Sequence, residues 1–508
     1  MTGLGHTLAV ALVGLTGHIV EVESHLAPSL PGFTLVGLPD ASLAEARDRV
    51  RAALTSSRIP WPQRRITVNL SPASLPKAGS AFDLAIAVAT LAGAGVCRAD
   101  AAAAVVHIGE LGLDGRLRPV RGVLPAVVAA VAAGHCRVVV PVANAAEARL
   151  VPGAQVLAAA HLAEVAREYG ADVEVPALAP VLGEAGGGPG PTAADLGDVL
   201  GQTTARWALE VAAAGGHHLL MVGPPGAGKT MLAARLPGLL PDLTERQAVE
   251  VTAVHSIAGT FRPSDGLVRR PPFEDPHHTA TPAAVIGGGS GMPRPGAASR
   301  AHCGVLFMDE APEFSPQVLQ TLRQPLESGE LVIHRSGGTA RYPARFQLVL
   351  AANPCPCGRA VGKGLDCACT PMARRRYFSR LSGPLLDRVD LQLEVLPVTR
   401  AERSGGQPES TATVATRVSA ARARARHRLA GTAWTTNAEV PGSWLRRHTG
   451  SGHRDLERAL DSGALSLRGL DRVLRVAWTL ADLAHRDSPQ SQDVGQALLL
   501  RTRGQLGR

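Results

Sequence analysis

Eight consecutive residues carry the clearest chemistry in this chain of 508 residues. They fit the pattern GxxxxGK(S/T) and run Gly223, Pro224, Pro225, Gly226, Ala227, Gly228, Lys229, Thr230. In such a loop the glycines let backbone N–H groups turn toward phosphate oxygens, the lysine reaches the β- and γ-phosphates, and the hydroxyl ligates Mg²⁺. The loop therefore predicts a site for ATP and Mg²⁺.

Two further apolar runs end in polar side chains suited to ATP hydrolysis. Residues 304–308 lead into Asp309 and Glu310, and residues 346–351 end close to Asn353. An aspartate can bind the Mg²⁺ shell, a glutamate can act as general base on the attacking water, and an amide can hold that water or sense the γ-phosphate. Taken alone, such endings are common in turns and at the surface. Combined with the phosphate loop, they predict hydrolysis.

These side chains need a parallel sheet to bring them together. Residues 218–222 (HLLMV) are a short apolar run that leads directly into the phosphate loop, and residues 231–236 suit a helix. A strand, a loop and a helix in this order are the context that the motif requires. We therefore expect an α/β domain whose buried strands lie at 218–222, 304–308 and 346–351.

The composition divides the chain into four parts. Residues 1–177 alternate β-branched runs (33–36, 66–70, 137–141) with Ala-rich stretches (81–92, 123–133), which predicts an α+β domain. Residues 178–194 are rich in Gly and Pro and predict a linker. Residues 195–399 carry the α/β core, and residues 400–508 are Arg-rich and helical.

Charge and hydropathy place the protein in the cytoplasm, away from membranes. The chain is 45% hydrophobic and 19% charged, and its longest apolar stretch, near residues 123–133, is shorter than the roughly 20 residues of a membrane helix. The first residues lack the pattern of a signal peptide. Only Lys77, Lys229 and Lys363 are lysines, so the abundant arginine indicates coding bias more than nucleic-acid binding.

Most of the net charge of +9 belongs to the C-terminal part, because residues 400–508 hold 18 basic and 10 acidic side chains. The densest basic run comprises Arg422, Arg424, Arg426, His427 and Arg428. Such a run can contact phosphates, or it can be the solvated face of a helix.

Four of the seven cysteines form two CxC pairs, Cys355 with Cys357 and Cys367 with Cys369. Thiolates at this density can close a tetrahedral zinc site if the nine residues between the pairs form a loop. The CxC spacing is less diagnostic than CxxC. The alternatives are reduced thiols or a redox pair in a loop.

Together these motifs resemble the AAA+ ATPases, and within them the magnesium-chelatase-like ComM/YifB family, over nearly the whole chain. The segments that carry the resemblance are GPPGAGKT (223–230), PHHTATPAAVIGGG (276–289), AHCGVLFMDEAPEF (301–314), LRQPLESGE (322–330), AANPCPCG (351–358) and LSGPLLDRVD (381–390). The resemblance implies a ring, usually a hexamer, with helicase and branch-migration activity during homologous recombination of incoming DNA. Single-stranded or branched DNA and recombination proteins are the implied partners.

The phosphate-binding machinery is equally compatible with a different class of function. A magnesium-chelatase-type or chaperone-like ATPase that remodels a protein partner would need the same loop and the same acidic pair. The discriminator is whether DNA or a protein stimulates ATP turnover.

The resemblance also assigns two arginines near the subunit boundary. Arg388, in the LLDR segment, would be an arginine finger that reaches the neighbour's γ-phosphate; its alternative is an intrachain ion pair with Asp387 or Asp390. Arg468 would be the second sensor, which contacts the γ-phosphate of ATP bound to its own subunit or to a neighbouring one. Arg472 is the other candidate.

Two segments of the core resemble insertions that line a ring. Residues 262–301 resemble the helix-2 insert of magnesium chelatase and MCM helicases, and they contain His277 and His278. Adjacent histidines on a helix or strand point in different directions, so we expect a pore-facing or intersubunit loop and no shared metal. Residues 330–345 predict a hairpin that would line the channel and touch DNA, or project outside the ring.

The N-terminal domain resembles the proteolytic domain of Lon, in which a lysine activates a nucleophilic serine. Here Ser80 falls near the serine motif, but the position that carries the lysine reads Ala126, and Lys77 is the only lysine of the domain. The resemblance therefore implies a Lon-like fold without peptidase activity, used as a platform for assembly or for DNA.

Overall fold

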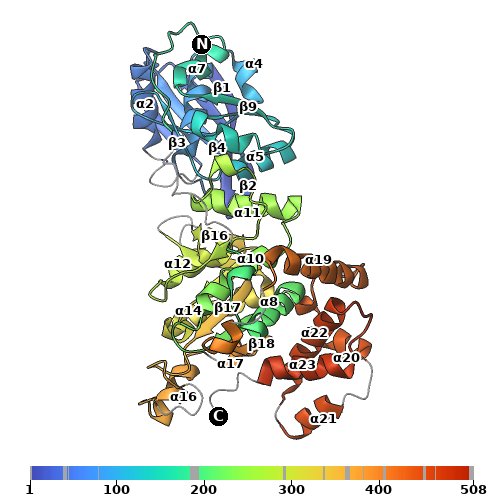
Figure 1. Ribbon diagram of the computed structural model, residues 1–508. Helices are drawn as coiled ribbons and strands as arrows, with labels where there is room; N and C mark the ends of the chain where they lie inside the picture. The colour runs from blue at the N-terminus through green and yellow to red at the C-terminus, as the bar shows by residue number, and fades with distance from the viewer. Residues whose placement is uncertain are drawn as a thin grey trace.

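The computed structural model describes residues 3–37, 43, 45–77, 79–182, 194–289, 293–335, 338–360, 366–381, 383–403, 408–449, 454–463 and 465–502. Most of the expected linker and the tip of the expected hairpin, at 336–337, lie outside these residues. Figure 1 shows an elongated molecule with the N-terminal sheet at one end, the central sheet at the other, and the C-terminal helices beside the central sheet. Within the described residues, no helix combines the length and apolar character needed to cross a membrane.

The N-terminal domain is built on a seven-stranded mixed sheet in the order β3-β4-β2-β1-β5-β8-β9. β1 and β2 form a long antiparallel hairpin, whereas β1, β5, β8 and β9 run parallel. The five stretches expected in this domain are β3, β4, β8, α3 and α5. The bounds of the strands are β1 (Gly3–Val13), β2 (Thr16–Ala27), β3 (Gly32–Val36), β4 (Arg65–Ser71), β5 (Val106–His107), β6 (Glu110–Leu111), β7 (Leu117–Arg118), β8 (Arg137–Pro141) and β9 (Gln155–Ala159).

Helices cover both faces of this sheet. Every residue of α3 is buried, Asp83 and Thr90 included, and α3 packs against β1 and β2. The bounds are α2 (Ala46–Ser56), α3 (Asp83–Gly93), α4 (Ala99–Ala103), α5 (Val123–Ala132), α6 (Ala145–Ala148) and α7 (Leu162–Glu168).

The central domain contains a five-stranded parallel sheet in the order β11-β14-β17-β10-β18. The three strands expected from the sequence are β10, β14 and β17, which lie side by side with their carboxyl ends at one edge. The bounds are β10 (Leu219–Val222), β11 (Phe273–Glu274), β14 (Val305–Met308), β17 (Gln347–Ala352) and β18 (Leu391–Glu394).

Alternating side chains of this sheet enter two different cores, which is why β10 and β14 are apolar at every position. Leu219 and Met221 face the core that contains α8, α19 and α22, whereas Leu220 and Val222 face the core that contains α12 and α14. The helices of this domain are α8 (Thr203–Gly215), α9 (Lys229–Ala233), α10 (Leu236–Leu239), α11 (Glu245–Ala258), α12 (Pro282–Ile286), α13 (Ala297–Arg300), α14 (Pro316–Thr321), α15 (Arg323–Ser328), α16 (Pro371–Ser379), α17 (Gly383–Leu386) and α18 (Arg400–Arg403).

Two small antiparallel pairs interrupt this α/β core. β12 (Gly287–Gly288) pairs with β13 (Arg294–Pro295) within the insert segment, and β15 (Glu330–Arg335) pairs with β16 (Gly338–Pro343) as the expected hairpin. The single helix expected after the phosphate loop is in fact two, because α9 ends at Ala233 and α10 starts at Leu236, immediately before Pro237.

Helices alone make up the described C-terminal part. α19 and α22 pack against α8, so these helices share one core with the central sheet. Their bounds are α19 (Thr411–Arg428), α20 (Gly442–His448), α21 (Arg454–Asp461), α22 (Leu467–Leu483) and α23 (Ser491–Thr502).

The N-terminal domain rests on α11 and on the β15–β16 hairpin, as Figure 1 shows. The turn between β1 and β2 presses on the hairpin: a Cβ added at Gly14, which has φ +63°, would lie 2.4 Å from the carbonyl oxygen of Arg341. Ile333 and Tyr342 of the hairpin are buried against Leu15. Local sequence patterns did not predict this contact.

A buried carboxylate reinforces the same junction. The Ser256 hydroxyl on α11 donates to Glu147, which also accepts the N–H of Leu124 at 2.9 Å. Burial raises the pKa of Glu147, and these hydrogen bonds oppose the rise.

Candidate functional site

The phosphate loop leaves the carboxyl end of β10 and becomes helical at Lys229. Gly226 and Gly228 have φ of +77° and +89°, which side chains with a Cβ rarely adopt. A Cβ on Gly226 would meet no atom within 4 Å, so the loop faces open space. These features fit a loop whose N–H groups take phosphate oxygens.

Lys229 is buried within the loop that it belongs to. Its Nζ donates to the carbonyls of Gly223 at 2.6 Å and Pro224 at 3.0 Å, and to Oδ1 of Asn353 at 3.1 Å. Burial lowers the pKa of Lys229, and the carboxylates of Asp309 and Glu310 oppose this. The ammonium is therefore held at the mouth of the loop, next to two acidic side chains.

Thr230 and Asp309 present adjacent oxygens beside the loop. The Thr230 hydroxyl donates to Oδ2 of Asp309 at 2.6 Å, and Oδ1 of Asp309 accepts the N–H of Glu310 at 2.9 Å. A hydroxyl and a carboxylate are oxygen ligands of the kind that Mg²⁺ takes. The donor set therefore fits the predicted Mg²⁺ site.

Glu310 has a left-handed backbone, with φ +50°, and its carboxylate lies 3.2 Å from Nδ1 of His278. The sequence missed this partner. His278 follows β11, which neighbours β14 in the sheet, and the strand order could not be read from the sequence. His277 and His278 lie in a loop, as expected, with their ring centroids 4.1 Å apart.

Asn353 follows β17, which pairs with both β10 and β14. Besides its contact with Lys229, its backbone hydrogen-bonds to the hydroxyl of Tyr377 on α16. Burial raises the pKa of Tyr377 to about 12. The structure thus brings the loop, Asp309 and Asn353 together at one edge of the sheet.

Arg388 lies at the opposite edge of that sheet. The N–H groups of Asp390 and Leu391 both donate to the carbonyl of His218 at 3.1 Å, just before β10 begins. The phosphate loop starts after the other end of β10, and a strand of four residues spans about 13 Å. Arg388 is therefore separated from its own chain's phosphate loop by the length of a strand.

Among the described ion pairs, the partner of Arg388 is neither Asp387 nor Asp390, the two intrachain partners expected as its alternative role. Arg388 pairs with Glu327 of α15, whereas Asp387 lies 3.5 Å from Arg468 and Asp390 lies 3.0 Å from Arg472. Arg468 is 82% exposed at its side chain. Both predicted γ-phosphate contacts, Arg388 and Arg468, therefore flank Asp387 on one side of the molecule.

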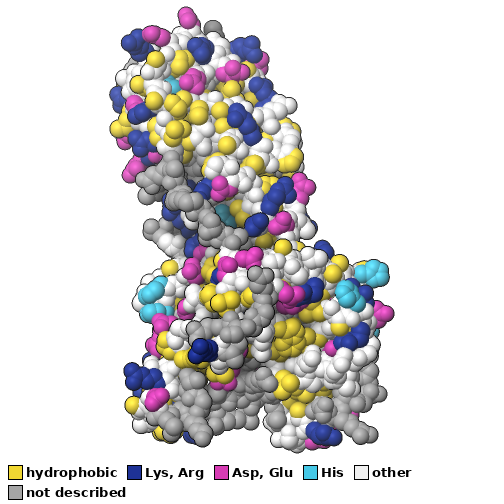
Figure 2. Space-filling model, viewed as in Figure 1, with side chains coloured by type: hydrophobic (Ala, Val, Ile, Leu, Met, Phe, Trp, Pro, Cys, Tyr) yellow, Lys and Arg dark blue, Asp and Glu magenta, His cyan; other side chains and the backbone are white. Residues whose placement is uncertain are grey.

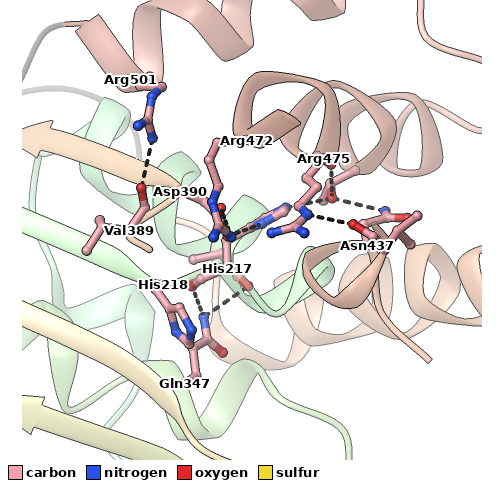
Figure 3. A network of polar contacts seen from close by, with 12 residues as sticks. His217, His218, Gln347, Val389, Asp390, Asn437, Arg472, Arg475 and Arg501 are labelled. Carbon is pink, nitrogen blue, oxygen red and sulfur yellow. Dashed lines mark hydrogen bonds and ion pairs between the residues drawn. The ribbon is translucent and has the colours of Figure 1, made fainter. Parts of the chain in front are cut away.

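Arg472 belongs to a buried network instead (Figure 3). Asp390, with no exposed side-chain surface, accepts from Arg472 at 3.0 Å and from His217 at 3.0 Å. His217 also contacts Thr479 of α22 at 2.8 Å. Burial opposes the charge of Asp390, but Arg472 and His217 outweigh it and hold the pKa well below its usual range.

This network joins the C-terminal helices to the start of three strands. Gln347 at the start of β17 donates to the carbonyl of His217 at 2.7 Å, and Arg501 of α23 donates to the carbonyl of Val389 at 2.8 Å. Asp390 lies two residues after Arg388, so the network also fixes the segment that carries Arg388. Arg472 takes part in this network through Asp390. Arg468 is therefore the more exposed of the two candidates for the second sensor.

Most of the basic run in α19 makes internal contacts. Arg422 donates to the carbonyl of Ala213 at 2.8 Å, Arg424 pairs with Asp487 at 2.8 Å, and Arg428 pairs with the buried Asp482. Burial lowers the pKa of Arg422 to about 10. Arg422 and Arg428 therefore bond within the fold, whereas Arg424 pairs with an exposed carboxylate, and Arg426 and His427 are exposed. On the face in Figure 2, basic and acidic side chains are intermingled.

The four cysteines converge as the sequence suggested. All four Sγ atoms lie within 4.8 Å of one another, and Cys355 Sγ is 3.3 Å from Cys357 Sγ and 3.5 Å from Cys367 Sγ. All are free thiols. Cys355 is buried, Cys367 and Cys369 are half-buried, and Cys357 is exposed.

In the N-terminal domain, Ser80 and Lys77 have separate partners. The Ser80 hydroxyl donates to Glu110, and the buried Lys77 amine donates to the carbonyl of Pro72. Burial lowers the pKa of Lys77. Ala126 lies in α5, whose residues VLPAVVAAVA offer no titratable side chain.

A parallel sheet whose strand ends carry a GxxxxGK(S/T) loop, an Asp–Glu pair and a polar amide defines a P-loop ATPase. The family description "Magnesium chelatase, subunit ChlI" matches residues 195–403, and two further descriptions of the same subunit match residues 22–144 and 408–501. The chain belongs to the ComM/YifB family of magnesium-chelatase-like AAA+ ATPases.

Relatives of full length agree with this assignment. An uncharacterized protein of Mycobacterium tuberculosis is 51% identical over 504 residues, 99% of each chain. The competence protein ComM of Haemophilus influenzae is 42% identical over 479 residues, 93% of this chain and 92% of its own. The YifB protein of Escherichia coli is 41% identical over 499 residues, 97% of this chain and 96% of its own.

Proposed function

We propose that the protein is an ATP-driven ring motor that acts on DNA in the cytoplasm, with helicase and branch-migration activity during homologous recombination of incoming DNA. One observation supports the proposal: the phosphate loop and Arg388, the predicted arginine finger, lie at two opposite edges of one sheet, so that a complete site would need two subunits. The relative from Haemophilus influenzae is named a competence protein, and the proposal extends that role to this chain.

Hydrolysis would use the residues at the carboxyl edge of the sheet. Backbone N–H groups of residues 223–228 and the ammonium of Lys229 hold the phosphates, and these contacts replace the bonds from Lys229 to the carbonyls of Gly223 and Pro224. Thr230 and Asp309 bind Mg²⁺, which neutralises charge on the phosphates. Glu310 takes the proton of the attacking water, and Asn353 orients that water.

Arg388 and Arg468 would complete the site of the neighbouring subunit. Because Arg388 lies about 13 Å or more from its own phosphate loop, a strand length away, its guanidinium serves ATP bound elsewhere. Arg468 lies 3.5 Å from Asp387, the residue before Arg388, so both charges would lie at the same proposed subunit boundary. A heterologous interface of this kind closes into a ring, and we propose a homo-hexamer.

The hairpin formed by β15 and β16 is the proposed DNA contact. His334 is exposed, and the side chain of Arg341 is 71% exposed, so both can meet a phosphate backbone. The hairpin leads directly into β17 and Asn353. A displacement of the hairpin would therefore shift Asn353 relative to the γ-phosphate. The N-terminal domain, which packs on the hairpin, serves as a platform without peptidase activity, in the manner of an inactive Lon domain.

The second candidate is an ATPase that remodels a protein partner in the manner of a magnesium chelatase. It is favoured by the match of all three parts of the chain to the chelatase subunit. ATP turnover of the full chain, measured with and without forked DNA at several salt concentrations, tests the two against each other. DNA stimulation that weakens with salt supports the motor, whereas turnover indifferent to DNA contradicts it.

A further inference from the structure

We propose that Cys355, Cys357, Cys367 and Cys369 bind one structural Zn²⁺ ion, and that this site holds the loop after β17 against the phosphate loop. The site lies outside the groups that hydrolyse ATP. Its effect on nucleotide binding rests on the proposed role of residues 223–230, whereas zinc binding itself does not.

The positions of the sulfurs fit a tetrahedral zinc site. Four thiolates at about 2.3 Å from Zn²⁺ lie about 3.8 Å apart. The Sγ–Sγ distances among Cys355, Cys357 and Cys367 are 3.3, 3.5 and 3.7 Å, and all four sulfurs lie within 4.8 Å of one another. Sulfurs in a disulfide would be about 2.05 Å apart. Four sulfurs select a soft or borderline metal such as zinc over Mg²⁺ or Ca²⁺.

Backbone N–H groups surround two of the sulfurs. N–H groups of Ala360 and Cys357 donate to Cys355, and the N–H of Arg359 donates to Cys357. Such outer hydrogen bonds orient the ligands of zinc sites. Cys369 also immediately precedes Thr370, which caps the nine-residue helix α16, so the positive end of that helix lies next to the cluster.

The cluster is tied to the ATP site at two points. Gly358 has φ +75°, and a Cβ added to it would lie 2.6 Å from Cδ of Pro225 in the phosphate loop. Cys355 comes two residues after Asn353, whose backbone hydrogen-bonds to Tyr377 of α16. A metal that fixes Cys355 and Cys357 to Cys369 therefore also fixes the contact of Gly358 with Pro225.

The first test is the metal content of the full chain, purified without a metal-affinity tag and measured by mass spectrometry of the elements. We expect about one zinc per chain, lost in the double variant C357S/C367S. The matched control is Cys303→Ser, whose half-buried thiol lies elsewhere, 3.3 Å from Nε2 of His302, and which should keep its zinc. The proposal is overturned if the wild-type protein contains no metal, whether these cysteines are reduced thiols or form disulfides with one another.

The second test leaves the thiols intact. Gly358→Ala should keep its zinc but bind a fluorescent ATP analogue about tenfold more weakly, a loss of about 1.4 kcal/mol. Gly266→Ala is the control, because Gly266 has a similar φ of +67° and no atom within 4 Å of an added Cβ. Equal nucleotide affinity in the two variants overturns the link to the phosphate loop. If the protein does not unwind DNA, the zinc content and the nucleotide affinities stay the same. A failure of the motor proposal can therefore be distinguished from a failure of the zinc proposal.

Discussion

Two inactive variants should restore each other's ATP turnover if each site is shared between subunits. Lys229→Ala removes the ammonium from the phosphate loop, and Arg388→Ala removes the guanidinium at the opposite edge of the sheet. Within one chain these groups are separated by the four residues of β10, about 13 Å. A site can therefore combine an intact Lys229 from one subunit with an intact Arg388 from its neighbour.

The expected magnitudes follow from this arrangement. Loss of an arginine finger lowers turnover by about 10³ to 10⁵, so neither variant alone should hydrolyse ATP measurably. In rings assembled from equal amounts of both, a competent site needs an Arg388→Ala subunit that binds ATP and a Lys229→Ala neighbour that donates Arg388. If the two variants are placed at random, each of the two subunits at a boundary is the required variant with a chance of about one half. About a quarter of the boundaries therefore meet this condition.

The assay is steady-state ATP turnover of rings coexpressed with two different tags and purified through both. Turnover near a quarter of wild type supports sharing. Turnover no higher than that of the separate variants refutes it, provided that the mixed rings assemble normally by light scattering. The control is a ring assembled from Arg58→Ala and Lys229→Ala subunits. Arg58 pairs with Glu174, and their side chains are 83% and 78% exposed. This ring should therefore retain the turnover of its Arg58→Ala subunits.

Three further predictions concern single residues. Glu310→Gln should bind ATP with wild-type affinity yet hydrolyse it at least about 100-fold more slowly, in filter-binding and turnover assays, because the general base is lost; normal hydrolysis would disprove its role. His278→Ala should change turnover by no more than about fivefold, since its half-exposed contact with Glu310 is worth at most about 1 kcal/mol; a larger change would contradict this. Asp390→Ala should lower the free energy of unfolding by about 3 to 5 kcal/mol in urea, because Arg472 and His217 lose a buried partner. The depressed pKa of Asp390 predicts that wild type keeps this stability at neutral pH and loses it as pH falls below about 4, whereas the variant should lack that acid dependence.

The sequence was sufficient for features that depend on neighbouring residues. β10, β14 and β17 lie where short apolar runs predicted them, because strands buried on both faces are apolar at every position. The strict spacing of the phosphate loop located Lys229 and Thr230. The hairpin formed by β15 and β16 lies within residues 330–345, where the segment around Gly337 and Gly338 predicted one.

Contacts between distant segments could not be predicted in this way. Arg388 pairs with Glu327, sixty-one positions earlier in the chain, and His278 meets Glu310 only because β11 lies next to β14. The arginines of α19 illustrate the same limit: their charge suggested a surface, but Arg422 and Arg428 bond to α8 and α22. Strand order and helix packing decide such pairs, and neither is written in local sequence patterns.

The most direct measurement is ATP-dependent strand separation by the full chain on forked and four-way DNA, followed with a fluorescent strand and with Glu310→Gln as the matched inactive protein. The proposed function predicts that wild type binds both substrates, hydrolyses ATP faster in their presence and releases strands, whereas Glu310→Gln binds DNA without releasing strands. Hydrolysis of ATP by wild type with neither DNA binding nor strand release would contradict it.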